Sequence, residues 1–89
     1  MGLETVEIVL DLEDHFEVAI PDAAASSTIT VADLQQVIVD LLVAKGKART
    51  PELQVEVWKG MMAVLAKQGY PVARIRPNSK WVGDITRYG

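Results

Sequence analysis

The chain opens with Met1-Gly-Leu-Glu-Thr-Val-Glu-Ile-Val-Leu-Asp-Leu-Glu-Asp-His-Phe16 and continues through Val18-Ala-Ile-Pro-Asp22. Apolar side chains recur in the first stretch at the spacing of one helix face, which we assign to Leu3, Val6, Val9, Leu10 and Phe16. Acidic side chains three or four residues apart line the other side, namely Glu4, Glu7, Asp11 and Asp14. The pattern predicts an amphipathic helix over residues 3–16, whereas the segment after it is too short to indicate a strand.

Capping residues predict two further long helices. Thr30 and Asp33 form a variant of the capping box, and Gly46 supplies a stop. The apolar side chains of this helix are Val31, Leu34, Val37, Ile38, Leu41 and Leu42. Thr50 caps the next helix with Pro51 at its first position, and Gly69 ends it before Pro71. We assign its apolar face to Val55, Trp58, Met61, Met62 and Leu65.

The remaining segments are short or irregular. Residues 23–27 read Ala-Ala-Ala-Ser-Ser and predict one or two helical turns. Residues 70–89 are expected to be mostly loop, held by apolar anchors at Val72, Ile75, Trp81, Val82 and Ile85. Ser79 is expected to cap a local turn in this loop.

Composition limits the class of protein. The chain has 89 residues, 49% of them hydrophobic, and no cysteine. This length favours one domain over residues 1–89 with a modest core. The lack of cysteine excludes disulfides and thiolate chemistry, and a cytoplasmic location is the simplest expectation. We expect no signal peptide and no membrane span.

Charge is distributed unevenly along the chain. The residues before Lys45 contain nine acids and no Lys or Arg, so this part carries about −9. The rest carries about +6, which gives the net charge of −3. The asymmetry indicates either an acidic docking surface or two halves that neutralise each other on folding.

The opening stretch resembles the second helix of the acyl carrier protein family and the loop that follows it. The positions that match the family pattern are Leu3, Val6, Glu7, Val9, Glu13, Phe16, Ile20, Pro21 and Asp22. Gly2 falls on the family's serine, which carries the phosphopantetheine arm, and a glycine has no hydroxyl for that attachment. Glu17 replaces a glycine that follows the phenylalanine in the family, and Ala23-Ala-Ala-Ser-Ser27 replaces an acidic region.

The resemblance extends over the chain in a changed order. Residues 1–44 resemble helices two to four of the family, and residues 51–89 resemble its first helix and first loop. In that loop Ile75 matches the family's buried anchor residue, and Trp81 matches its aromatic residue. Asp84 and Ile85 match the family's Asp-Leu pair. The resemblance implies an all-α, acyl-carrier-like four-helix bundle of three main helices and one short helix, circularly permuted. We expect a monomer, with exchange of the C-terminal helix between two chains as the alternative.

Few residues offer catalytic or ligand chemistry. His15 is the only histidine, and we expect it to be an exposed residue near a helix C-terminus rather than a general base or metal ligand. Thr5, Ser26 and Ser27 are not expected to replace the missing serine. Trp58 and Trp81 are expected to pack in the core. A mild basic patch comprises Arg74, Arg76, Lys80 and Arg87, and without a nucleic-acid motif it does not indicate nucleic-acid binding.

These observations favour a non-catalytic interaction module without catalytic, metal or cofactor-binding residues. The resemblance implies docking through Glu4, Glu7, Asp11 and Asp14 onto a basic patch of a biosynthetic enzyme, in fatty acid, polyketide or related synthesis. A solvated helix face is the plainer interpretation of the same acids. The alternative function is a genuine acyl or peptidyl carrier whose phosphopantetheine is attached unconventionally or supplied by another chain. A small enzyme is the third and weakest hypothesis.

Overall fold

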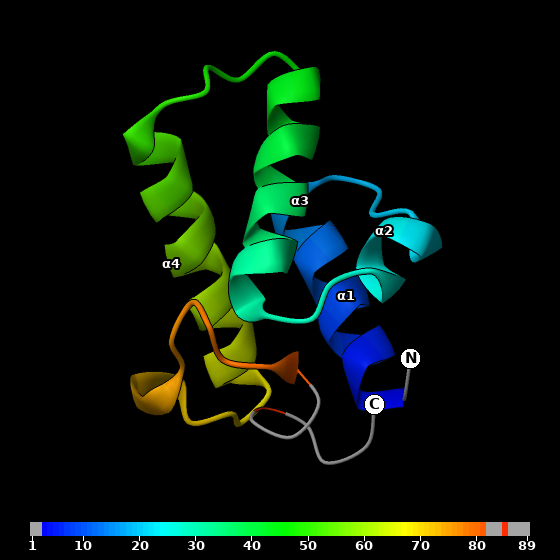
Figure 1. The fold of residues 1–89 in the computed structure, drawn as a ribbon, viewed down its shortest axis with the longest axis vertical. Helices are drawn as coiled ribbons and strands as arrows, with labels where there is room; N and C mark the ends of the chain where they lie inside the picture. Colours follow the sequence, from blue (N-terminus) through cyan, green and yellow to red (C-terminus); the bar gives the residue numbers. More distant parts are fainter. Residues whose placement is uncertain (1–2, 82–84, 86–89) are drawn as a thin grey trace.

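The structure is a computed structural model, and it describes the backbone of residues 3–81 and 85 and the side chains of this range from Val6 onward. Its helices are α1 (Leu3–Phe16), α2 (Asp22–Ser26), α3 (Val31–Ala44) and α4 (Pro51–Lys67), with a 3-10 turn η1 (Val72–Arg74). Three long helices and one short helix form a small bundle (Figure 1). The prediction of an all-α bundle is confirmed.

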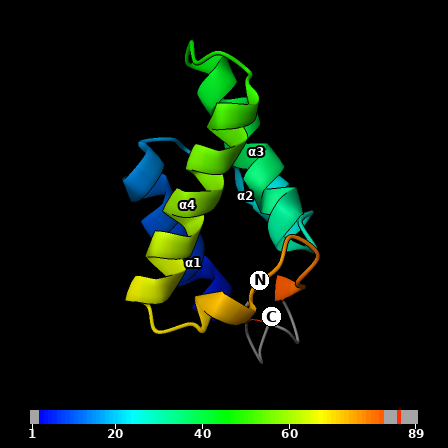
Figure 2. The same ribbon diagram turned by 90° about the vertical axis from the view of Figure 1, so that its left-hand side faces the viewer.

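Helix α4 holds the bundle together. It packs against both α1 and α3, which share far fewer contacts with each other, and α2 packs on α3. Figure 2 shows α4 lying across the other two long helices. The fully enclosed side chains come from all three long helices: Ile8, Leu12, Val31, Leu34, Ile38, Val39, Val57, Met61 and Leu65. These side chains form one core, and the six residues from Lys45 to Thr50 join α3 to α4.

The buried face of α1 differs from the predicted one. Ile8 and Leu12 are fully buried and Val9 nearly so, whereas Leu10 is 54% exposed and Val6 is 37% exposed. Including Leu10 and Val6 in the core face was wrong. Apolar residues occupy most of the circumference of α1, so helical periodicity admits more than one face. The position of α4 decides which face is covered.

The predicted face of α4 is also partly wrong. Met61 and Leu65 are buried as expected, but Val55 is 52% exposed and Trp58 and Met62 are only half-buried. The buried positions that sequence reasoning missed are Leu53, Val57, Gly60 and Val64. Helix α4 lies between two neighbours, so its buried surface is a broad band rather than the single stripe that we assigned.

The predicted helix starts are confirmed. The Thr30 hydroxyl accepts from the Asp33 amide, and the Asp33 carboxylate accepts from the Thr30 amide at 3.0 Å, which completes the capping box. These backbone hydrogen bonds, with one from the Ile29 amide, lower the pKa of Asp33. At α4, the Thr50 hydroxyl accepts from the Leu53 amide, with Pro51 in the first turn.

The segment after α4 caps the N-terminus of α3 with backbone hydrogen bonds. The amides of Val31 and Ala32, which have no partner within their own helix, donate to the carbonyls of Ser79 and Pro77, each at 2.9 Å. The Trp81 amide donates to the Ile29 carbonyl at 3.0 Å. The predicted anchors Ile75 and Trp81 are buried, Val72 and Ile85 are half-buried, and Val82 lies outside the described residues.

The predicted turn cap is confirmed in the same segment. The Ser79 hydroxyl accepts from the Arg76 amide at 2.8 Å, and the Ser79 amide donates to the Arg76 carbonyl. This turn places the carbonyls of residues 77 and 79 against the start of α3, so local turn chemistry supports the long-range contact.

The three long helices end in the same Schellman arrangement. The amides of Val18, Lys47 and Tyr70 each donate to the carbonyl five residues earlier. This arrangement requires a residue with positive φ just before the donor. Gly46 (φ +108°) and Gly69 (φ +92°) meet the requirement freely, but at the end of α1 the residue is Glu17 (φ +54°).

We expect the Glu17→Gly substitution to raise the free energy of unfolding by about 0.5–1 kcal/mol. Left-handed backbone costs a residue with a Cβ about 1–2 kcal/mol, and the extra freedom of glycine in the unfolded chain cancels part of that gain. Urea denaturation of the native protein and the variant measures the difference. Glu17→Ala, which removes the side chain but keeps the Cβ, is the control, and equal stability of the two variants would contradict the explanation.

Candidate docking face on the first helix

The predicted docking acids do not all have the same environment. Glu7 and Asp14 are exposed on α1, whereas Asp11 between them is half-buried. The Glu4 side chain and Gly2 lie outside the described residues. The structure therefore places three of the four predicted acids along the outer surface of α1.

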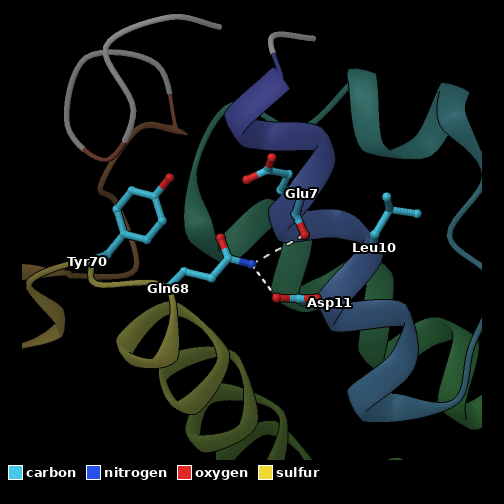
Figure 3. Close-up of a pocket in the computed structure, with 5 residues that line it drawn as sticks. All are labelled: Glu7, Leu10, Asp11, Gln68 and Tyr70. Carbon is cyan, nitrogen blue, oxygen red and sulfur yellow. Dashed lines mark hydrogen bonds between the residues drawn. The ribbon is translucent and has the colours of Figure 1, made fainter.

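Asp11 has a structural partner on α4. Its Oδ2 accepts a hydrogen bond of 2.5 Å from Nε2 of Gln68, the residue directly after α4 (Figure 3). The same nitrogen donates to the backbone carbonyl of Glu7 at 3.3 Å. Asp11 thus ties α1 to the end of α4, and its carboxylate is less available to a partner than those of Glu7 and Asp14.

Two shallow hollows lie along the junction of α1 and α4. The first, of about 460 Å³, is lined by Glu7, Leu10, Asp11, Gln68 and Tyr70 (Figure 3). The second, of about 320 Å³, is lined by Asp11, Asp14, His15, Ala63, Val64 and Lys67. Asp11 contributes to both, so the two hollows and the acids between them form one continuous surface, which we call the α1 docking face.

The acids of this face form no ion pair with a Lys or Arg side chain in the described part of the chain. No Lys or Arg nitrogen there lies within 4.0 Å of the carboxylates of Glu7, Asp11 or Asp14. Lys67 borders the second hollow without forming such an ion pair. Carboxylates at this spacing repel one another, which an opposite charge on a partner would relieve.

Exposed apolar side chains accompany the acids. Val6 and Leu10 lie one helical turn apart on α1, and Leu10 borders the first hollow. The sequence pattern predicts both in the core, and the structure shows instead that they are surface residues. A surface that combines isolated acids with solvated aliphatic side chains offers a partner both charge complementarity and apolar area.

Two other polar side chains near this face have structural roles. Glu13 accepts a hydrogen bond of 2.7 Å from the Ile20 amide and so fixes the loop after α1. The ring of His15 meets that of Phe16 edge-on, with centroids 4.8 Å apart. Both rings lie against Gly60 of α4, where a Cβ would come within 2.4 Å of Phe16 Cζ. Gly60 therefore permits the close approach of α1 and α4, a requirement that the sequence did not reveal.

The described residues contain no group of three or more His, Cys, Asp or Glu side chains placed to hold a metal ion. Among the described helices, none has the length and apolar character needed to cross a membrane. Comparison with known proteins found no matching family model, no similar curated protein and no similar solved structure.

Proposed function

We propose that the protein is a non-catalytic interaction module that docks through the α1 docking face onto a basic, partly apolar patch of a protein partner. The observation that carries the proposal is the combination of exposed Glu7 and Asp14 with exposed Val6 and Leu10 on one helix. None of these acids has a cationic partner among the described residues. Folding alone does not require this combination, because neighbouring carboxylates repel one another and solvated apolar side chains contribute no burial energy.

Two features support an acyl-carrier-like module, and with it a biosynthetic enzyme as partner. Glu17 has positive φ at the position where the carrier family has a glycine. In addition, α4 packs against both α1 and α3 of its own chain, which is the arrangement that a permuted carrier requires. With Gly2 at the position of the family's serine, we propose that the module acts without a phosphopantetheine arm.

We expect the double variant Glu7→Lys, Asp14→Lys to lose most of its partner binding while it keeps the fold. Complementary charge mainly accelerates association, and reversing two exposed charges should slow it by about tenfold or more at low salt. Asp11 is left unchanged because it bonds Gln68. The partner is first captured from the native host with the unaltered protein, and its association rate is then measured against salt.

The matched control is Glu52→Lys, Glu56→Lys, which makes the same change in net charge at two exposed acids of α4. We expect this control to bind as fast as the native protein at each salt concentration. If the α1 variant also binds at the native rate at low salt, the α1 acids are a solvated face and the docking proposal fails.

The alternative, a genuine carrier with an unconventionally attached or separately supplied arm, has its own measurement. Mass spectrometry after incubation with coenzyme A and a phosphopantetheinyl transferase tests whether the arm is attached to this chain. A mass increase equal to the phosphopantetheine arm would replace the arm-free module with a carrier. An unchanged mass supports the arm-free module.

A further inference from the structure

A groove on another side of the bundle is lined by a cation and apolar residues, whereas the α1 docking face is acidic. It has a volume of about 470 Å³ and lies between α3, α4 and the turn after η1. Its lining comprises Gln35, Gln54, Val55, Trp58, Ile75, Arg76 and Pro77. No residue of α1 borders it, and its lining contains one cation and no acid. Figure 2 shows the turn after η1 beside the lower end of α3.

The floor of the groove is apolar and incompletely covered. Val55 in the lining remains 52% exposed, and Trp58, one turn along α4, is only half-buried. Tryptophan with one exposed side is typical of protein-binding surfaces, because a large apolar area is buried at a small cost in side-chain entropy. An aliphatic side chain placed on Val55 and Trp58 would remove this area from water.

The rim of the groove holds a positioned guanidinium group. Nη1 of Arg76 donates to the carbonyl oxygens of Ala73 at 3.0 Å and Ile75 at 3.3 Å. These hydrogen bonds orient the plane of the group, while no Asp or Glu carboxylate among the described side chains lies within 4.0 Å of it. A guanidinium group held in place on one side can donate its remaining N–H groups to a carboxylate in the bidentate geometry typical of arginine.

A hydrogen bond between α3 and α4 fixes one wall of the groove. Nε2 of Gln35 on α3 donates to the backbone carbonyl of Gln54 on α4 at 2.9 Å, which joins the two helices beside the groove. Gln54 also borders the groove, and a glutamine side chain can both donate and accept hydrogen bonds. A groove whose walls are fixed before binding loses less entropy when it is occupied.

We propose that this groove binds a segment of a partner protein that carries an aliphatic side chain beside a carboxylate. The aliphatic side chain would pack on Val55 and Trp58, and the carboxylate would pair with Arg76. Charge complementarity selects this occupant, because the lining contains a cation without an acidic partner. The site is separate from the α1 docking face and takes a partner segment of the opposite charge.

The test is a titration of the isotopically labelled protein, followed by NMR, with the blocked peptide acetyl-Asp-Leu-Leu-Asp-amide. We expect saturable shifts of the Trp58 indole and Arg76 side-chain signals, with no shift of the buried Trp81 indole as an internal control. Acetyl-Asn-Leu-Leu-Asn-amide should bind about tenfold more weakly, as expected for loss of a charge-assisted hydrogen-bonded pair.

Three variants test the contributions of Arg76 and of the apolar lining separately. Arg76→Gln should weaken binding of the acidic peptide about tenfold. Arg74→Gln, at a neighbouring exposed arginine outside the groove, should leave it unchanged. Val55→Ser should weaken the binding of both peptides by the same factor. If the Trp58 signal does not shift saturably, or if Arg76→Gln binds the acidic peptide as tightly as the native protein, the proposal is overturned.

Discussion

Replacing Trp81 by alanine is expected to lower the free energy of unfolding by about 3–5 kcal/mol. The Trp81 side chain is only 3% exposed, although it follows an irregular segment that holds a single 3-10 turn. Its removal leaves a cavity where the last part of the chain packs onto the bundle. A domain of this size has about 5–15 kcal/mol of stability in total, so the melting temperature should fall by more than about 12 °C.

Trp58→Ala is the matched control, because it removes the same side chain from a half-buried position on α4. Its cost should be smaller, since part of the Trp58 side chain is already in contact with water. Urea denaturation monitored by the fluorescence of the remaining tryptophan measures both variants. Equal losses would contradict the deeper burial of Trp81 relative to Trp58.

Removing all residues after Lys45 is expected to abolish cooperative folding. Helices α1 and α3 each pack against α4 and have little contact with each other, so the truncated chain has no closed core. It also loses the enclosed side chains of Val57, Met61 and Leu65. Fragments this short rarely bury enough apolar surface to fold without a metal, a disulfide or a second chain.

The measurement is a thermal melt of residues 1–45 followed by circular dichroism, alone and after addition of residues 46–89. We expect no cooperative transition for the first fragment by itself and a transition when both fragments are present. A cooperative melt of residues 1–45 alone would show that α1 and α3 form a core without α4, which would contradict the need for α4 in the folded core.

The sequence by itself determined the helices and their ends. Thr30 with Asp33, and Thr50 with Pro51, mark helix starts through hydrogen bonds and dihedral preferences that involve only neighbouring residues. Gly46 and Gly69 mark helix ends for the same reason, because positive φ is a local property of one residue. The acids of α1 were also visible in the sequence as candidate docking residues, since their spacing alone places them on one side of a helix.

Only the tertiary structure decided which faces are buried and what borders each surface. Leu10 and Ile8 are both aliphatic residues of α1, yet the first is solvated and the second enclosed because α4 lies on one side. The bond between Asp11 and Gln68 joins residues 57 positions apart, and the groove brings Arg76 beside Val55 and Trp58. Periodicity in the sequence indicates a helix and its candidate apolar positions, but it does not identify the element that packs on them. Contacts between residues distant in the sequence depend on how the helices pack.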